Sequence, residues 1–143
     1  MADLLLLVTL GGRRIAIHAA DVEAVVELDG ITPAPRAPDH VAGLAALRSR
    51  VLTVIDAAAS LEIGRSIREG LHEAIVVPSG GHPYALIVDA VDDVVDGSTP
   101  LPIGAPIGAG WERVAIGMVD VEGELLLLVD PHLIIAGPAA LAA

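Results

Sequence analysis

Histidine is a frequent catalytic residue and metal ligand in proteins, so the histidines of this chain are considered first. The five histidines are His18, His40, His72, His82 and His132. No two of them have the HxH or HxxxH spacing of a metal-binding strand or helix, and none stands with Asp or Glu in a recognisable ligand pattern. The sequence therefore predicts no metal site.

The usual nucleophiles and phosphate-binding loops of enzymes are also missing. The chain has no cysteine and no GxSxG motif, and its serines stand in turn and loop contexts. Its glycine pairs lack a following helix at phosphate-loop spacing, so they indicate turns. Asp92 and Asp93 are neighbours that would not face each other on a helix, which favours an acidic surface over a catalytic pair. We therefore predict that the protein is not an enzyme and holds no cofactor.

An apolar surface is the remaining candidate for function. Val22 and Val25 have helical spacing in the segment 19–26, which we predict to begin as a short helix and to pass into a strand that ends near Leu28. An exposed aliphatic groove at such a place suits an amphipathic helix of a partner. The alternative is that these valines belong to the core, and the sequence leaves both interpretations open.

Arg48 is a charged residue within the largely apolar segment 41–57. Leu44 and Leu47 precede it, and it begins a polar break that we predict to be a turn between two strands. One interpretation is an ordinary turn arginine. The other is a charged anchor beside an apolar groove, as in the binding hot spots of protein interfaces.

Two similar halves must position these residues. Residues 43–56 and 117–130 align without gaps, with glycine at both starts and aspartate at both ends. At an offset of 69 residues the turn signal Gly11-Gly12 matches Gly80-Gly81, and Val22 and Val25 match Val91 and Val94. A hairpin, a short helix, a proline-containing connector, a second hairpin and a capped helix thus occur twice in the same order, which indicates an internal repeat.

The repeat predicts a mainly β fold of two similar β-barrel lobes, because a small sheet curls and closes to remove its edges. We expect short helices after Asp56 and from Asp89 to Val95, and a C-terminal helix that begins at Asp130-Pro131. The expected single domain covers 1–143, with lobes built from roughly 5–70 and 71–136 that exchange strands.

Charge and hydropathy exclude several classes of protein. The net charge is −11, and residues 71–143 carry one arginine against ten acidic residues, which argues against nucleic acid or an anionic membrane as partner. No apolar run approaches the roughly 20 residues of a membrane helix, so we expect no membrane insertion. The N-terminus lacks a basic region and a cleavage site, and we expect a cytoplasmic protein.

A long irregular segment offers an alternative function. Residues 97–110 contain three prolines and four glycines, and Trp111 follows them. A loop of this length in a small domain is usually functional. The alternative hypothesis is a small-molecule-binding β-barrel module in which residues 97–111 form a lid.

The segment 43–56 also carries a family resemblance. The chain resembles the CheW-like domain, the adaptor of bacterial chemotaxis arrays, from about Leu5 to Ile135. The family signature has the form G-x-x-N-L-R-G-x-x-x-P-x-x-D, and this chain keeps its glycine, leucine, arginine and aspartate as Gly43, Leu47, Arg48 and Asp56. Residues 88–94, VDAVDDV, and the stretch 117–130 match two further marks of the family. The asparagine, second glycine and proline of the signature are replaced by Ala46, Ser49 and Thr53.

The resemblance implies two SH3-like β-barrels and a scaffold without enzymatic activity. It implies that one barrel end contacts the regulatory domain of a histidine kinase, and that a groove between the lobes takes the helical cytoplasmic tip of a chemoreceptor. It also implies a cytoplasmic protein that is recruited to membrane receptor arrays.

Individual positions follow from the same resemblance. Arg48 occupies the place of an arginine implicated in receptor coupling, and Val22 matches a groove position, so our candidate receptor-binding residues are Arg48, Val22, Val25 and Leu44. Ala42 stands where relatives often carry lysine. Ser49 is expected to take over a glycine's conformation, with strain if its φ is positive.

Overall fold

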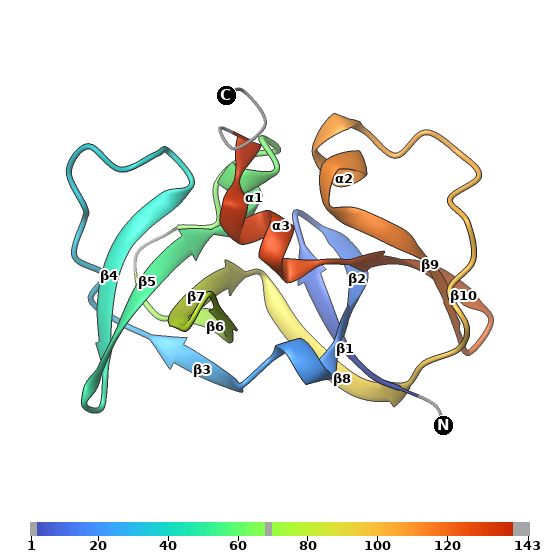
Figure 1. Ribbon diagram of the computed structural model, residues 1–143, viewed down its shortest axis with the longest axis horizontal. Coiled ribbons are helices and arrows are strands. Elements are labelled where there is room, and N and C mark those ends of the chain that lie inside the picture. Colours follow the sequence, from blue (N-terminus) through green and yellow to red (C-terminus); the bar gives the residue numbers. More distant parts are fainter. Residues whose placement is uncertain (1–2, 68–69, 139–143) are drawn as a thin grey trace.

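The computed structural model describes residues 3–67 and 70–138, which form two curled five-stranded sheets (Figure 1). The first lobe contains β1 (Leu4–Leu10), β2 (Arg13–His18), β8 (Ala90–Asp96), β9 (Ala115–Val121) and β10 (Glu124–Val129). The second lobe contains β3 (Ala24–Leu28), β4 (Val41–Leu47), β5 (Arg50–Asp56), β6 (His72–Ser79) and β7 (His82–Val88). The strand orders are β8-β1-β2-β10-β9 and β3-β6-β7-β5-β4.

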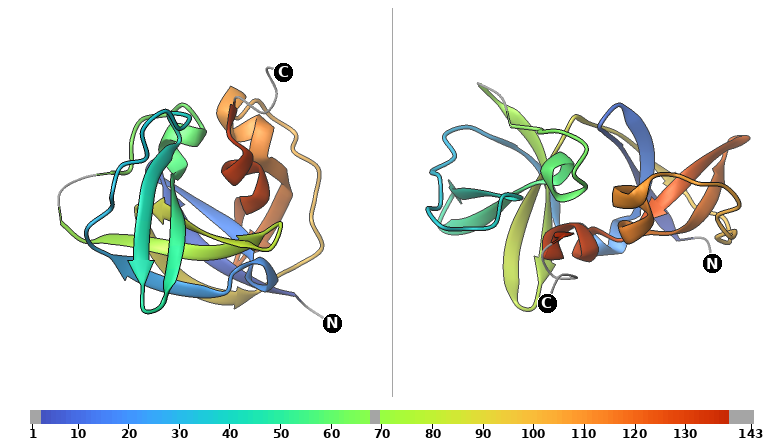
Figure 2. Two further views of the ribbon diagram at one scale, coloured as in Figure 1. Left: turned by 60° about the vertical axis from the view of Figure 1, so that its left-hand side comes forward. Right: turned by 90° about the horizontal axis from the view of Figure 1, so that it is seen from above.

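Short helices join the strands in the described part of the chain. They are the 3₁₀ helix η1 (Ala19–Asp21) and the α-helices α1 (Ala57–Ser60), α2 (Ala109–Val114) and α3 (Pro131–Ala136). The three α-helices lie on the same side of the two lobes (Figures 1 and 2). The predicted mainly β fold with two barrel-like lobes, short helices and a C-terminal helix is therefore confirmed.

The internal repeat is visible in the order of the strands. Replacing β1–β5 by β6–β10, and the reverse, converts the order of one sheet into the order of the other. Each sheet takes its two inner antiparallel strands, β1 and β2 or β6 and β7, from one repeat and its other three strands from the other repeat. The segments 5–70 and 71–136 therefore both contribute strands to both sheets.

The turns of the two repeats match in detail. Gly11 and Gly12 have φ values of 60° and 77°, and Gly80 and Gly81 have 60° and 80°. Two successive residues with positive φ match the type I′ turns of two-residue hairpins, which glycine adopts without a steric cost. The glycine pairs thus set the register of β1–β2 and of β6–β7.

Three apolar clusters form the core of the protein, one inside each lobe and one between the lobes. One fills the second lobe around Leu52 and Ile87, and another fills the first lobe around Leu7 and Leu128. The largest lies between the lobes, where one face of β1, β2, β6 and β7 meets the α-helices. We call this largest cluster the inter-lobe core. Burial of each leucine or isoleucine side chain in these clusters contributes about 1.5–3 kcal/mol to the free energy of unfolding.

The inter-lobe core explains the hydropathy of the strands. Residues 5–8, 15–17, 74–77 and 85–88 are continuously buried, because their strands have a lobe interior on one face and the inter-lobe core on the other. The edge strand β4 has buried and exposed residues in alternation, since only one of its faces is covered.

The prediction of a helix from Asp89 to Val95 is wrong, because these residues form most of β8. The misleading signal was the three-residue spacing of Val91 and Val94. The register between β8 and β1 shifts so that Asp92 is an extra residue, a β-bulge. One extra residue lengthens the two-residue period of a strand to three residues, which imitates a helix.

The helix predicted to begin at Ala19 is much shorter than its spacing suggested. Only the single turn of η1 forms, and Val22 is already extended with φ −106° and ψ 120°. Val25 lies in β3, and not on a helix. The strand predicted from the β-branched pair Val25-Val26 and expected to end near Leu28 is β3.

Candidate protein-binding groove

An apolar groove lies where the two lobes meet. Its volume is about 190 Å³, and its walls come from β1 and β8 of the first lobe and from η1, β3 and the link between them. We call it the junction groove. Its lining residues are Leu6, Ala19, Val22, Glu23, Ala24, Val25 and Val94.

The groove brings together three of the valines that the sequence singled out. Val25 of β3 and Val94 of β8 are equivalent in the repeat, and their exposed fractions are 49% and 51%. Val22 is half-buried and packs against the inter-lobe core, as does its equivalent Val91. Both interpretations of these residues therefore apply, with Val25 and Val94 on the surface and Val22 and Val91 at the edge of the core.

Leu6 and Ala24 are groove residues that the sequence did not single out. Leu6 is 4% exposed and closes the floor of the groove. Leu6 pairs with Val94 across β1 and β8. A signal for it existed in the unbroken apolar run 4–8, because an internal strand with two buried faces borders any groove between lobes.

Arg50 connects the β4–β5 hairpin to the groove. Its guanidinium forms an ion pair with Glu23, which lines the groove. Both side chains are partly exposed, so the pair contributes little to stability. The pair nevertheless shows that the start of β5 lies beside the link between η1 and β3.

Arg48 and Leu44 lie on the same hairpin but do not line the groove. Both side chains are exposed, Leu44 on β4 and Arg48 in the turn before β5. The expected positive φ falls on Arg48, at 58°, and not on Ser49. The equivalent turn residue of the other repeat, Glu122, also has a positive φ, at 51°. The loss of the signature glycine therefore does not strain Ser49.

A second cleft lies beside the segment expected to form a lid. Its volume is about 540 Å³, and it is lined by Leu61, Glu62, Ile63, Gly108, Ala109, Gly110, Trp111, Arg113 and Pro138. Trp111 belongs to α2, is 6% exposed and packs in the inter-lobe core, with the Arg13 guanidinium 5.2 Å from its ring centre. The tryptophan therefore anchors the segment to the core.

Arg113 joins the three α-helices at this cleft. It donates hydrogen bonds to the Leu133 carbonyl at 2.8 Å and to the Ser60 carbonyl at 2.6 Å. Burial lowers the pKa of the Arg113 guanidinium, and the nearby Glu62 carboxylate opposes this shift. Because its donors are directed at helix ends, the arginine acts as a structural clamp.

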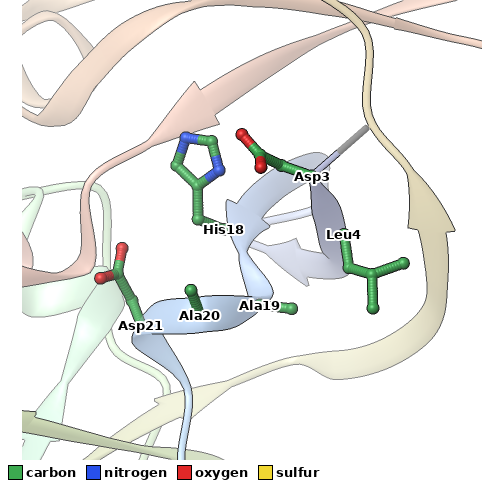
Figure 3. A pocket seen from close by; sticks show the side chains of 6 residues that line it. All are labelled: Asp3, Leu4, His18, Ala19, Ala20 and Asp21. Carbon is green, nitrogen blue, oxygen red and sulfur yellow. The ribbon is translucent and has the colours of Figure 1, made fainter. Parts of the chain in front are cut away.

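A third and larger pocket, of about 680 Å³, opens beside β1 and η1 (Figure 3). The Asp3 carboxylate and the His18 ring lie toward the same side of this pocket. His132 of α3 approaches Asp21 of η1, with Nε2 3.5 Å from Oδ1. Within residues 3–67 and 70–138, no group of three or more His, Asp or Glu side chains is arranged to hold a metal ion.

Within residues 3–67 and 70–138, no helix is long and apolar enough to cross a membrane.

Fold and site together describe a two-lobed β domain with an apolar groove at the lobe junction. The family model of the CheW-like domain matches residues 4–138. The chain belongs to the CheW-like domain family, which confirms the resemblance.

Named relatives agree with this assignment. The chain is 35% identical over 137 residues to the chemotaxis protein CheW of Rhizobium meliloti, which covers 85% of this chain and 86% of the relative. It is 30% identical over 115 residues to a probable chemotaxis protein CheW of Rhizobium etli, which covers 77% and 74%. The crystal structure of the scaffolding protein TtCheW from Thermoanaerobacter tengcongensis has a similar fold, with a TM-score of 0.74, 24% identity, and coverage of 90% and 89%.

Proposed function

We propose that this chain is a non-enzymatic scaffold that couples the helical cytoplasmic tip of a chemoreceptor to the regulatory domain of a histidine kinase. Its membership of the CheW-like domain family supports this proposal, as do relatives that are named chemotaxis proteins. The protein acts in the cytoplasm and is recruited to membrane receptor arrays. The kinase domain binds at one barrel end, and the receptor tip binds at the junction groove.

The observation that carries the proposal is the junction groove. Val25 and Val94 are half-exposed on two edge strands, and Leu6 forms an apolar floor between them. Its volume of about 190 Å³ is below the roughly 300–1,000 Å³ of small-molecule pockets. A shallow aliphatic groove of this kind suits the apolar face of a helix.

The β4–β5 hairpin extends the receptor surface. The ion pair between Arg50 and Glu23 shows that this hairpin lies at the rim of the groove. Arg48 and Leu44 are exposed on the same hairpin. We assign Arg48 as a charged anchor and Leu44 as an apolar contact for the part of the receptor tip that leaves the groove.

The small-molecule hypothesis has weaker support. Trp111 is buried in the inter-lobe core, and Arg113 donates hydrogen bonds to carbonyl groups of α1 and α3. The aromatic and cationic groups of that cleft are therefore engaged within the protein. The observation in favour of this hypothesis is the cleft itself, because its volume of about 540 Å³ falls within the range of small-molecule pockets.

A binding measurement with a single substitution tests the groove. Val25→Asp places a charge in the apolar groove, and we expect it to weaken binding of a purified chemoreceptor tip fragment at least tenfold, because a desolvated carboxylate is costly. The matched control is Ile116→Asp on β9, where the wild-type side chain is 50% exposed and outside the groove.

Titration calorimetry and circular dichroism should be run on both variants. The proposal requires that both fold like the wild type and that only Val25→Asp loses receptor binding. Equal binding by the two variants would show that the receptor does not use the junction groove.

A further inference from the structure

The two edge strands of the junction groove carry the same pattern of apolar and acidic residues. In β3, Val25 is followed two positions later by Glu27. In β8, Val94 is followed two positions later by Asp96, and the repeat aligns both pairs. All four side chains are exposed. Because side chains two positions apart in a strand share a face, each acid lies on the same side of its strand as the groove valine.

The directions of the strands place the two acids at opposite ends of the groove. β3 and β8 run away from the lobe junction in opposite directions (Figure 1). Val25 and Val94 line the groove, and Glu27 and Asp96 lie beyond them along each strand. The groove therefore has an apolar centre and one carboxylate beyond each end.

Two other acids near the groove are engaged within the protein. Glu23 pairs with Arg50, and Asp92 pairs with Arg14 and accepts a hydrogen bond from the Thr9 hydroxyl. Among residues 3–67 and 70–138, no ion pair involves Glu27 or Asp96.

The surroundings increase the negative potential at these ends. Glu27 lies opposite Glu73 in the pairing of β3 with β6. The chain carries a net charge of −11 and no lysine. Such a field attracts and orients cationic partners before contact.

We propose that the helix bound in the junction groove carries an apolar side chain at its centre and an arginine or lysine toward each end. This inference rests on the proposed function, because it specifies the chemistry of the helix that the groove receives. The apolar side chain sits between Val25 and Val94, and the two cations pair with Glu27 and Asp96.

Two synthetic helical peptides test this charge rule. They share one central leucine stripe and differ only in the flanking residues, which are arginine in one and glutamate in the other. At low salt we expect the arginine peptide to bind the full chain about tenfold more tightly, with a preference that falls as salt is added. In the double variant Glu27→Arg/Asp96→Arg the preference should reverse.

A matched control separates these two acids from the overall charge. The variant Glu112→Arg/Glu122→Arg makes the same change in net charge at exposed acids of α2 and of the β9–β10 turn. It should keep the preference for the arginine peptide. Equal binding of both peptides to the wild-type chain, or an equal loss of preference in both double variants, would overturn the charge rule.

The outcome also distinguishes this inference from the proposed function. If a chemoreceptor tip binds and is lost with Val25→Asp while neither peptide preference appears, the receptor site stands and the charge rule is wrong. If neither the receptor tip nor the peptides bind the folded chain, both proposals are wrong.

Discussion

Arg48, the proposed receptor anchor, has an unusual backbone conformation and an exposed side chain. Its backbone adopts a positive φ of 58° in an exposed turn, and its side chain forms no ion pair with any residue that the structure describes. A non-glycine residue in this conformation is uncommon. Glu122, the equivalent residue of the other repeat, also has a positive φ, although there the next residue, Gly123, shares it. The side chain of Arg48 is thus available for a partner.

Substitution of Arg48 should affect binding and not folding. For Arg48→Ala we expect a change in unfolding free energy of about 0.5 kcal/mol or less, because the side chain is exposed and unpaired. We expect receptor-tip binding to weaken at least tenfold, because truncation of a hot-spot side chain costs about 2 kcal/mol or more. Urea unfolding and titration calorimetry measure the two effects.

Glu122→Ala, at the equivalent turn of the other repeat, is the control. It should match Arg48→Ala in stability and keep wild-type binding. If Arg48→Ala unfolds the protein, the arginine has a structural role and its assignment as a receptor anchor is wrong.

Asp56 shows that one signature residue is structural. Its carboxylate is 1% exposed and accepts backbone hydrogen bonds from Ala59 at 3.1 Å, Ser66 at 2.8 Å and Ile67 at 3.4 Å. It thus caps α1 and also holds the segment that follows this helix. Its equivalent, Asp130, caps α3 with a single bond from His132 at 2.9 Å.

The two aspartates should therefore differ in their contribution to stability. Asp56→Ala leaves the buried Ser66 N–H and the partly buried N–H groups of Ala59 and Ile67 without this acceptor, and we expect a loss of about 3 kcal/mol. Asp130→Ala removes one cap, and we expect a loss of about 1 kcal/mol. Urea unfolding of both variants measures the difference, and equal losses would contradict the role given to the residues after α1.

At the scale of elements, the stability of helix α2 depends on its contacts with the core and with α1 and α3 more than on its own sequence. Helix α2 has six residues, and its N-cap residue, Gly108, offers no side-chain hydrogen bond. An isolated helix of this length is not stable in water. Trp111 inserts into the inter-lobe core, and Arg113 clamps α2 to α1 and α3. The helix therefore forms because of tertiary contacts.

Removal of the clamp should loosen all three α-helices. Arg113→Met keeps the aliphatic stem but removes the donor to the Ser60 carbonyl and one of the two donors to the Leu133 carbonyl, which keeps its bond from the Gly137 N–H. We expect a loss of about 2 kcal/mol. Arg65→Met, at an exposed arginine, should cost about 0.5 kcal/mol or less. Hydrogen exchange should show faster exchange in α1, α2 and α3 for Arg113→Met only. Unchanged protection there would contradict the clamp.

The same dependence explains which elements could be predicted from the sequence. Hairpins with a glycine pair and helices with an aspartate cap carry local signals, so β1–β2, β6–β7, α1 and α3 were found. Helix α2 has no cap signal, and the segment 97–110 was expected to stay irregular to its end. β8 was mistaken for a helix because the bulge at Asp92 alters the valine spacing.

At the scale of the whole molecule, the repeat makes the two lobes inseparable. β2 pairs in parallel with β10, and β5 pairs in parallel with β7, so each repeat completes the sheet of the other. The junction groove lies where β3 and β8 leave the shared core. The groove is thus a consequence of the strand exchange, because it needs one edge strand from each repeat.

The repeat was also the basis for predicting part of the candidate groove. Alignment of Val25 with Val94 predicted a pair of related apolar positions, and the structure places both in one groove. The apolar run 4–8 indicated a buried strand at Leu6, but the place of Leu6 at the groove floor depends on how the lobes meet. The positions of Arg48 and Leu44 outside the groove likewise depend on the curl of the β4–β5 hairpin.

The most direct test of the central claim is whether the chain holds both partners at once. Size-exclusion chromatography with light scattering should be run on the chain with a chemoreceptor tip fragment and a histidine kinase regulatory domain, separately and together. A scaffold predicts one complex that contains all three proteins, at concentrations where the receptor fragment and the kinase domain do not bind each other. Mutually exclusive binding of the two partners, or binding of neither by the folded chain, would contradict the account.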